Sequence, residues 1–109
     1  MNIGIIGCGA ISDQYMIGLN KNQEILKVVA CADLDSNKSD VFSKKHKIDM
    51  LSVEEIFVNN DIDLIVNLTP PSSHFEISMK SKELLGESQI SLKSNHTTPF
   101  EDLTVLIFL

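Results

Sequence analysis

Positive charge and long hydrophobic segments are both scarce in this sequence. Nine Lys and Arg residues stand against fifteen Asp and Glu, so the net charge is −6. A chain with this acidic balance and no basic stripe is not expected to bind nucleic acid or an anionic membrane surface. No uninterrupted apolar run exceeds five residues, whereas a membrane-spanning helix needs about 20. The composition therefore argues against nucleic acid and membranes as partners.

Cysteine is also rare, and the chain is short. Cys8 and Cys31 follow no spacing that is typical of a metal or redox motif, so we expect reduced thiols in a cytoplasmic protein and no metal site. The N-terminus does not resemble a signal peptide. A chain of 109 residues is expected to form one domain, without space for a separate substrate domain.

The first dozen residues have the pattern of a buried strand, a glycine turn and the start of a helix. In dinucleotide-binding folds the first glycine allows the tight turn and the second lets the backbone approach the pyrophosphate. The free amides at the start of the helix attract the anion. A purely structural turn is the alternative, since such turns are common in α/β domains. The candidate phosphate-binding residues are Gly7, Gly9, Ala10, Ile11 and Ser12, the last being small enough for close packing of the helix on the strand.

Asp33 is the candidate ribose-binding residue. It lies 21 positions after Ser12, directly after a β-branched and nearly all apolar stretch at residues 25–32. A carboxylate at this place accepts hydrogen bonds from the adenosine ribose and repels a 2′-phosphate, so NAD is favoured over NADP as the cofactor. The alternative role is that of a helix N-cap, which the pattern assigns to Asp35 or Ser36.

Strands and helices alternate along the rest of the chain. Strands are expected over residues 25–32 and 61–68, and helices over 10–20, 37–46 and from the capping-box residue Ser52 to about residue 60. The residues expected to face the sheet are Ile11, Tyr15, Met16, Leu19, Val41 and Phe42. This order predicts an α/β fold: a Rossmann-like parallel sheet with flanking helices, incomplete and within a single domain.

A second group of candidate residues follows the strand at 61–68. Thr69 and Pro70 end that strand, and His74 lies in the helix expected after it. Ligands of parallel sheets bind beyond the carboxyl ends of the strands. The glycine turn, Asp33 and these three residues all fall at that edge, which predicts one shared binding site.

Three segments together resemble the N-terminal domain of the Gfo/Idh/MocA oxidoreductases. They are residues 5–12, 30–33 and 66–74, and the resemblance covers residues 1–86. It implies an NAD(P)-binding Rossmann domain in which Thr69, Pro70 and His74 line the cofactor pocket near the nicotinamide. It also implies a sugar, polyol or related substrate, held mostly by a separate C-terminal domain.

The resemblance stops at Gly86. The family continues with a Glu-Lys-Pro signature whose lysine assists proton transfer, and Lys93 stands in register with that lysine. Its neighbours are Leu92 and Ser94, so a coincidental lysine is the alternative to a catalytic one. Residues 87–109 are interpreted as a divergent tail in place of the usual strand and substrate domain. A frameshift after Gly86 would explain the abrupt change.

Three functional readings follow from this pattern. The favoured one is a dinucleotide-binding domain of an oxidoreductase that has no turnover by itself. The others are a non-catalytic NAD-binding regulatory module and a catalytic half that pairs with a separately encoded substrate domain. The apolar end of the chain, residues 105–109, has no partner domain to cover it, so self-association through it is also expected.

Overall fold

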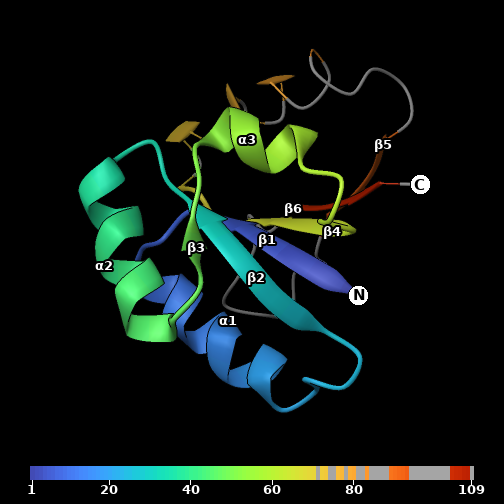
Figure 1. Ribbon diagram of the computed structural model, residues 1–109. Coiled ribbons are helices and arrows are strands. Elements are labelled where there is room, and N and C mark those ends of the chain that lie inside the picture. Colours follow the sequence, from blue (N-terminus) through green and yellow to red (C-terminus); the bar gives the residue numbers. More distant parts are fainter. Residues whose placement is uncertain are drawn as a thin grey trace.

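A computed structural model describes residues 1–70, 72–73, 76–77, 79–80, 83, 89–93 and 104–108. Strands and helices alternate along most of this part of the chain (Figure 1). The elements are β1 (Asn2–Ile6), α1 (Ala10–Asn20), β2 (Lys27–Ala32), α2 (Ser36–His46), β3 (Asp49–Met50), α3 (Val53–Val58), β4 (Leu64–Asn67), β5 (Gln89–Lys93) and β6 (Thr104–Phe108).

The strands form one sheet in the order β3-β2-β1-β4-β6-β5. β1 pairs in parallel with both β2 and β4, and β2 pairs in parallel with β3. The predicted parallel Rossmann-like sheet is therefore confirmed for these four strands. Because β1 lies at their centre, the turn that follows it opens between the ends of two neighbouring strands, which is where ligands bind in this architecture.

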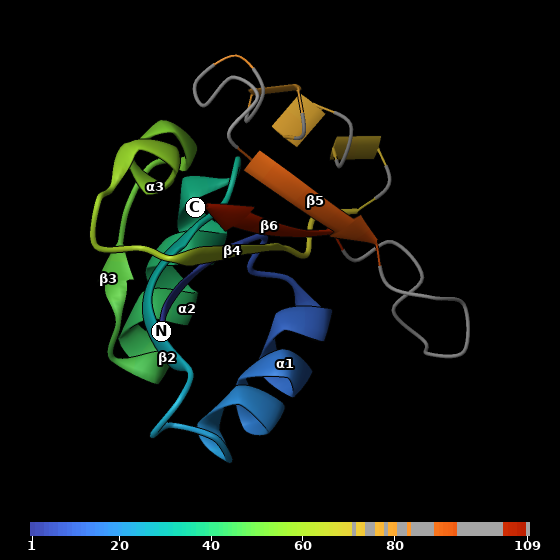
Figure 2. The same cartoon turned by 90° about the vertical axis from the view of Figure 1, so that its right-hand side faces the viewer.

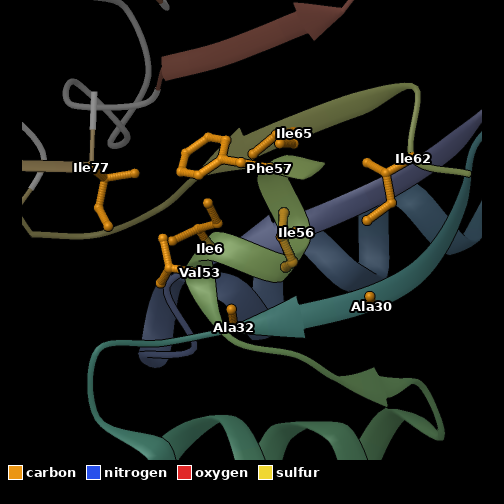
Figure 3. Packing of buried hydrophobic residues seen from close by; sticks show 9 residues of the cluster. All are labelled: Ile6, Ala30, Ala32, Val53, Ile56, Phe57, Ile62, Ile65 and Ile77. Carbon is orange, nitrogen blue, oxygen red and sulfur yellow. The ribbon is translucent and has the colours of Figure 1, made fainter. Parts of the chain in front are cut away.

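Helices cover both faces of the sheet, α1 and α2 on one and α3 on the other (Figure 1). Successive residues of β1 point to opposite faces. Ile5 packs in a cluster with Met16 of α1 and Phe42 of α2. Ile6 packs in the opposite cluster, with Phe57 of α3 (Figure 3). A strand buried on both faces must be apolar at every position, which explains the unbroken hydrophobic character of this segment.

The predicted capping box at Ser52 is confirmed. Its hydroxyl accepts from the Glu55 amide at 3.0 Å, and the Glu55 carboxylate accepts from the Ser52 amide at 3.0 Å. Asp35 caps α2 by accepting from the Asn37 amide at 3.0 Å, which settles the choice between Asp35 and Ser36. The two-residue strand β3 was not predicted, because so short a pairing has no periodic signal.

The prediction of the buried helix faces was wrong at two positions. Ile11 is 42% exposed and Val41 is 66% exposed, whereas Ser12, Ser39 and Ser43 are buried. The two α2 hydroxyls donate to carbonyl oxygens three residues earlier, at 3.1 Å from Ser39 and 2.9 Å from Ser43. A buried serine satisfied in this way lets a helix approach the sheet closely, so small polar residues replace the larger apolar ones.

The end of the chain pairs with the rest of the sheet. β6 pairs antiparallel with β4, and β5 pairs antiparallel with β6 (Figure 2). β6 therefore takes the place beside β4 that the next parallel strand has in a doubly wound sheet. Two strands from residues 87–109 are thus part of the same sheet as the dinucleotide-binding motif.

Candidate dinucleotide-binding site

Gly7 is required by the backbone of the turn after β1. Its φ angle of +104° is one that residues with a side chain rarely adopt. A Cβ atom at Gly7 would lie 2.7 Å from the carbonyl carbon of Leu68 and from the amide of Thr69. The Gly7 amide donates to the Ala32 carbonyl at 2.8 Å. The turn is therefore held against β2 and β4 at once, and only glycine fits there.

Gly9, in contrast to Gly7, has open space where a side chain would lie. It is the N-cap residue of α1, and a Cβ atom at this position would meet nothing within 4 Å. No side chain caps α1, whereas Asp35 caps α2 and Ser52 caps α3. Among these three helices, the first amides of α1 are thus left for an outside acceptor, with open space in front of the N-cap. This arrangement fits an anion such as a phosphate.

Ser12 closes the first turn of α1. Its side chain is fully buried, and both its amide and its hydroxyl donate to the Gly9 carbonyl, the amide at 3.1 Å. The predicted small residue at the third motif position therefore has a second function, fixing the orientation of the N-cap. Gly9, Ala10 and Ile11, by contrast, are exposed. The five candidate residues thus divide into a buried support, Gly7 and Ser12, and an exposed rim.

Asp33 joins the two strand ends that form the site. One carboxylate oxygen accepts from the Cys8 amide at 2.7 Å, and the other accepts from the Asp35 amide at 2.8 Å. Each carboxylate oxygen can accept more than one hydrogen bond, so capacity remains for a ribose hydroxyl. Asp33 is only partly buried. The residue predicted from spacing therefore lies beside the glycine turn and holds it in place.

Thr69 and Pro70 follow β4 at the same edge of the sheet. Thr69 is buried, and its amide and hydroxyl both donate to the side-chain oxygen of Asn67, at 3.1 and 2.5 Å. Pro70 is exposed, and its carbonyl accepts from the Ser73 amide at 2.9 Å. His74 lies outside the described residues, so its predicted place in the site stays a prediction.

Asn67 is a residue of this edge that the sequence reasoning missed. It is fully buried at the end of β4, and its side-chain nitrogen has no hydrogen-bond partner within the described part of the chain. The available signal was one polar residue inside an otherwise apolar strand. Its oxygen fixes Thr69, so Asn67 shapes the segment that continues from β4.

Lys93 is the last residue of β5. Asn67 of β4 pairs with Thr104 of β6, and Thr104 pairs with Lys93. Two successive antiparallel pairings make β5 parallel to β4, so Lys93 lies at the same carboxyl edge as the glycine turn. Neighbouring strands are about 4.8 Å apart, which separates the Lys93 and Asn67 backbones by roughly 10 Å.

Two further classes of site are absent from the part of the chain that the structure describes. No three His, Cys, Asp or Glu side chains there are grouped so that they could hold a metal ion. No helix within the same residues has the length and apolar character to span a bilayer.

The comparisons with known proteins agree with this geometry. The family model described as "Oxidoreductase family, NAD-binding Rossmann fold", GFO_IDH_MocA, matches residues 1–84. A search of curated protein sequences gives no significant match.

Solved structures show the same fold at low sequence identity. A putative myo-inositol dehydrogenase from Sinorhizobium meliloti 1021 is 20% identical, with a TM-score of 0.67 over 77% of this chain and 25% of its own. The myo-inositol dehydrogenase of Lactobacillus casei, solved with NAD(H) and myo-inositol, is 19% identical, with a TM-score of 0.65 over 76% of this chain and 25% of its own. The WlbA dehydrogenase of Bordetella pertussis, solved with NADH and UDP-GlcNAcA, is 16% identical, with a TM-score of 0.68 over 78% and 27%.

This chain thus spans about a quarter of the length of the dehydrogenases that it resembles in structure. The match covers the glycine turn, Asp33 and the Thr69-Pro70 segment, all within residues 1–84. The chain therefore belongs to the Gfo/Idh/MocA family of oxidoreductases, and residues 1–84 correspond to the family's NAD-binding Rossmann domain.

Proposed function

We propose that this chain binds NAD at the carboxyl edge of its sheet, as the cofactor domain of an oxidoreductase that acts on a sugar, polyol or related substrate. The observation that carries the proposal is the uncapped start of α1 with open space in front of Gly9. The pyrophosphate would accept hydrogen bonds from the first amides of α1, where the helix dipole favours negative charge. When bound, NAD supplies hydride transfer.

We assign the adenosine ribose to Asp33 and infer a preference for NAD over NADP. The Asp33 carboxylate is fixed beside the glycine turn by two backbone amides, at 2.7 and 2.8 Å. Its negative charge would repel the 2′-phosphate of NADP. An arginine often accommodates that phosphate in NADP enzymes, and this sequence contains none.

The substrate class is inferred from the relatives, two of which are described as inositol dehydrogenases. We propose that Lys93 faces the substrate and that Thr69, Pro70 and His74 line the nicotinamide end. The parallel direction of β5 and β4 supports this assignment, because Lys93 ends β5 at the same edge of the sheet as the glycine turn. We further propose that the 109 residues alone do not turn over substrate, that residues 1–86 form the cofactor domain, and that the protein is cytoplasmic.

The decisive test is the substitution Gly9→Asp. A Cβ atom at Gly9 meets nothing within 4 Å, and Asp is a better N-cap residue than glycine, so the fold should be kept. The new carboxylate would accept from the α1 amides and repel the phosphates. We expect NAD affinity, measured by calorimetric titration, to fall at least about tenfold, with unchanged thermal stability.

Gly18→Ala is the matched control. Gly18 lies in the same helix, and a Cβ atom there also meets nothing within 4 Å. This variant should unfold at a slightly higher temperature, because alanine in a helix interior is favoured over glycine by about 0.5–1 kcal/mol. Its NAD affinity should equal that of the unmodified chain. Equal NAD affinity in Gly9→Asp would refute the proposed site.

A further inference from the structure

Asn67 is the buried polar residue at the end of β4. Its side chain is fully buried, and its oxygen accepts from both the amide and the hydroxyl of Thr69, at 3.1 and 2.5 Å. The side-chain nitrogen has no partner among the described residues, so the oxygen makes the hydrogen bonds that this side chain has there. An asparagine often accepts in this way from the amide two residues later, and shaping a turn is then its whole role. The surroundings of Thr69 indicate a further role here.

The peptide that Asn67 fixes is the one that lies against the glycine turn. A Cβ atom at Gly7 would be 2.7 Å from the Leu68 carbonyl carbon and from the Thr69 nitrogen, and 3.0 Å from the Leu68 carbonyl oxygen. The Leu68–Thr69 peptide therefore packs directly on the Cα atom of Gly7, with no side chain between them. A side chain at the end of β4 thus sets the position of a wall of the turn after β1.

Backbone pairing alone does not hold this peptide. The Leu68 amide donates to the Ile6 carbonyl at 2.7 Å, which continues the pairing of β4 with β1. The next amide, that of Thr69, donates to the Asn67 side chain instead. The orientation of the Leu68–Thr69 peptide therefore depends on a side chain, which a substitution can remove while the backbone pairing of β4 stays.

We propose that Asn67 is a positioning residue for the dinucleotide: it holds the Leu68–Thr69 peptide against Gly7 and so keeps the glycine turn in the shape that receives the pyrophosphate. The inference rests on the proposed function, in which this turn binds NAD. Gly7 has a φ angle of +104°, and its amide donates to the Ala32 carbonyl at 2.8 Å. The turn is thus confined by β2 on one side and by this peptide on the other, and loss of the second wall should loosen it.

The first experiment measures the turn without a cofactor. Asn67→Leu keeps the approximate size of the side chain but removes the oxygen, which leaves the Thr69 amide and hydroxyl without their acceptor. In amide hydrogen exchange followed by NMR, the Gly7 amide should exchange at least about tenfold faster, relative to the amides of β1, than in the unmodified chain. An equal change at Gly7 and in β1 would overturn the proposal.

Ile56→Val is the matched control. Ile56 is buried in α3, and its truncation lowers stability without touching the hydrogen bonds of Asn67. A general loss of stability affects the amides of the core alike, so the Gly7 amide and the β1 amides should change by the same factor in this variant. The control therefore separates loosening of the turn from loss of stability.

The second experiment compares NAD with ADP-ribose, which has the same pyrophosphate but no nicotinamide. Calorimetric titration should show that Asn67→Leu binds both ligands about tenfold more weakly than the unmodified chain, because the turn receives the group that they share. Ile56→Val should keep both affinities. A loss for NAD alone would assign Asn67 to the nicotinamide end and overturn the proposal, and unchanged affinities in Asn67→Leu would do the same.

Substitutions of Thr69 test whether Asn67 acts through this residue. Thr69→Val removes one of the two hydrogen bonds, so it should weaken both ligands by about threefold, and Thr69→Ser should recover most of that loss. In the Asn67→Leu background, Thr69→Val should cause no further loss, because the interaction is already absent. Additive losses would overturn the route through Thr69. If Asn67→Leu fails to fold, Thr69→Val takes its place in both experiments.

Failure of the proposed function has a different signature. If the unmodified chain binds neither NAD nor ADP-ribose, the proposed function fails together with the role of Asn67 in binding, while exchange of the Gly7 amide still decides whether Asn67 holds the turn. If the unmodified chain binds both ligands and Asn67→Leu binds them equally well, the proposed function stands and the positioning role is overturned.

Discussion

At the scale of single residues, the site depends on two glycines that serve opposite purposes. At Gly7 a side chain would collide with the backbone after β4. At Gly9 a side chain would occupy the open space in front of α1. The first is a requirement of the fold, and we propose that the second leaves space for a ligand. Asp33 combines both kinds of role, since its carboxylate holds the turn and lies where a ribose would bind.

Asp33→Asn should separate the two roles of this carboxylate. An amide side chain offers only one acceptor atom, so one of the bonds from the Cys8 and Asp35 amides is lost, together with the negative charge. We expect NAD binding to weaken by about 1–3 kcal/mol and the preference over NADP to shrink, as measured by calorimetric titration of both cofactors.

Asp63→Asn is the control for that substitution. Asp63 also accepts from a backbone amide, that of Asn2 at 2.8 Å, but it directly precedes β4, at the edge of the sheet opposite the glycine turn. It should leave both cofactor affinities unchanged. If NADP binds to the unmodified chain as well as NAD does, the role assigned to Asp33 is wrong.

At the scale of elements, Asp13 of α1 contacts two side chains of α2. The Asp13 carboxylate of α1 contacts the His46 ring at 2.9 Å and the Lys45 ammonium at 3.2 Å, both from the last turn of α2. His46 also lies against Phe42, with ring centroids 4.4 Å apart. The contact ties together the two helices on one face of the sheet, and with them the helix that begins at the glycine turn.

Asp13→Asn should lower stability in a pH-dependent way. The hydrogen bond with His46, and then Lys45, holds the pKa of Asp13 below its ordinary value of 3.8. A carboxyl group with a lowered pKa in the folded state stabilises the fold above its unfolded pKa, and this stabilisation is lost as pH falls through the folded pKa. Because the Asp13 side chain is 42% exposed, the effect at neutral pH should be below about 1 kcal/mol.

Urea unfolding at neutral and at strongly acidic pH measures this effect. The free energies of unfolding of the Asp13→Asn variant and the unmodified chain should differ at neutral pH and converge well below pH 3.8. Asp40→Asn is the control, since Asp40 pairs with Lys44 within α2 alone and should matter less. A difference between Asp13→Asn and the unmodified chain that persists in acid would assign the effect to packing instead.

At the scale of the whole molecule, one of the described strands, β6, runs opposite to its neighbours in the sheet. Four parallel strands carry the cofactor motif, and the pair β6 and β5 extends them beyond β4. β6 is thereby covered on both edges, and β5 becomes the outer strand on that side. The apolar run near the C-terminus is thus accounted for within the fold, while an edge strand remains.

The isolated chain is still predicted to self-associate. Residues 103–109 combine high β propensity, high hydrophobicity and no charge. Within the sheet, β5 is the outer strand on the side of β6. Light scattering at high protein concentration should detect species larger than a monomer. Ser91→Lys, which places a charge on the edge strand, should reduce their amount. A monodisperse monomer of the unmodified chain would contradict the prediction.

The sequence alone determined the parallel part of the fold. Glycine conformation, capping chemistry and the spacing of apolar residues act within a few positions of the chain, so the turn at Gly7, the capping box at Ser52 and the strand before Asp33 could be predicted from local pattern. All three elements are present, although the strand before Asp33 begins at Lys27, two residues later than predicted.

Tertiary structure decided what depends on partners distant in the chain. The burial of the serines of α1 and α2 against the sheet and the pairing of β6 with β4 depend on segments whose proximity no local pattern specifies. The apolar sequence of residues 104–108 fits either a strand beside β4 or an unpaired tail. The strand forms because the backbone amides and carbonyls on the outer edge of β4 need hydrogen-bond partners, which the residues before β6 do not provide.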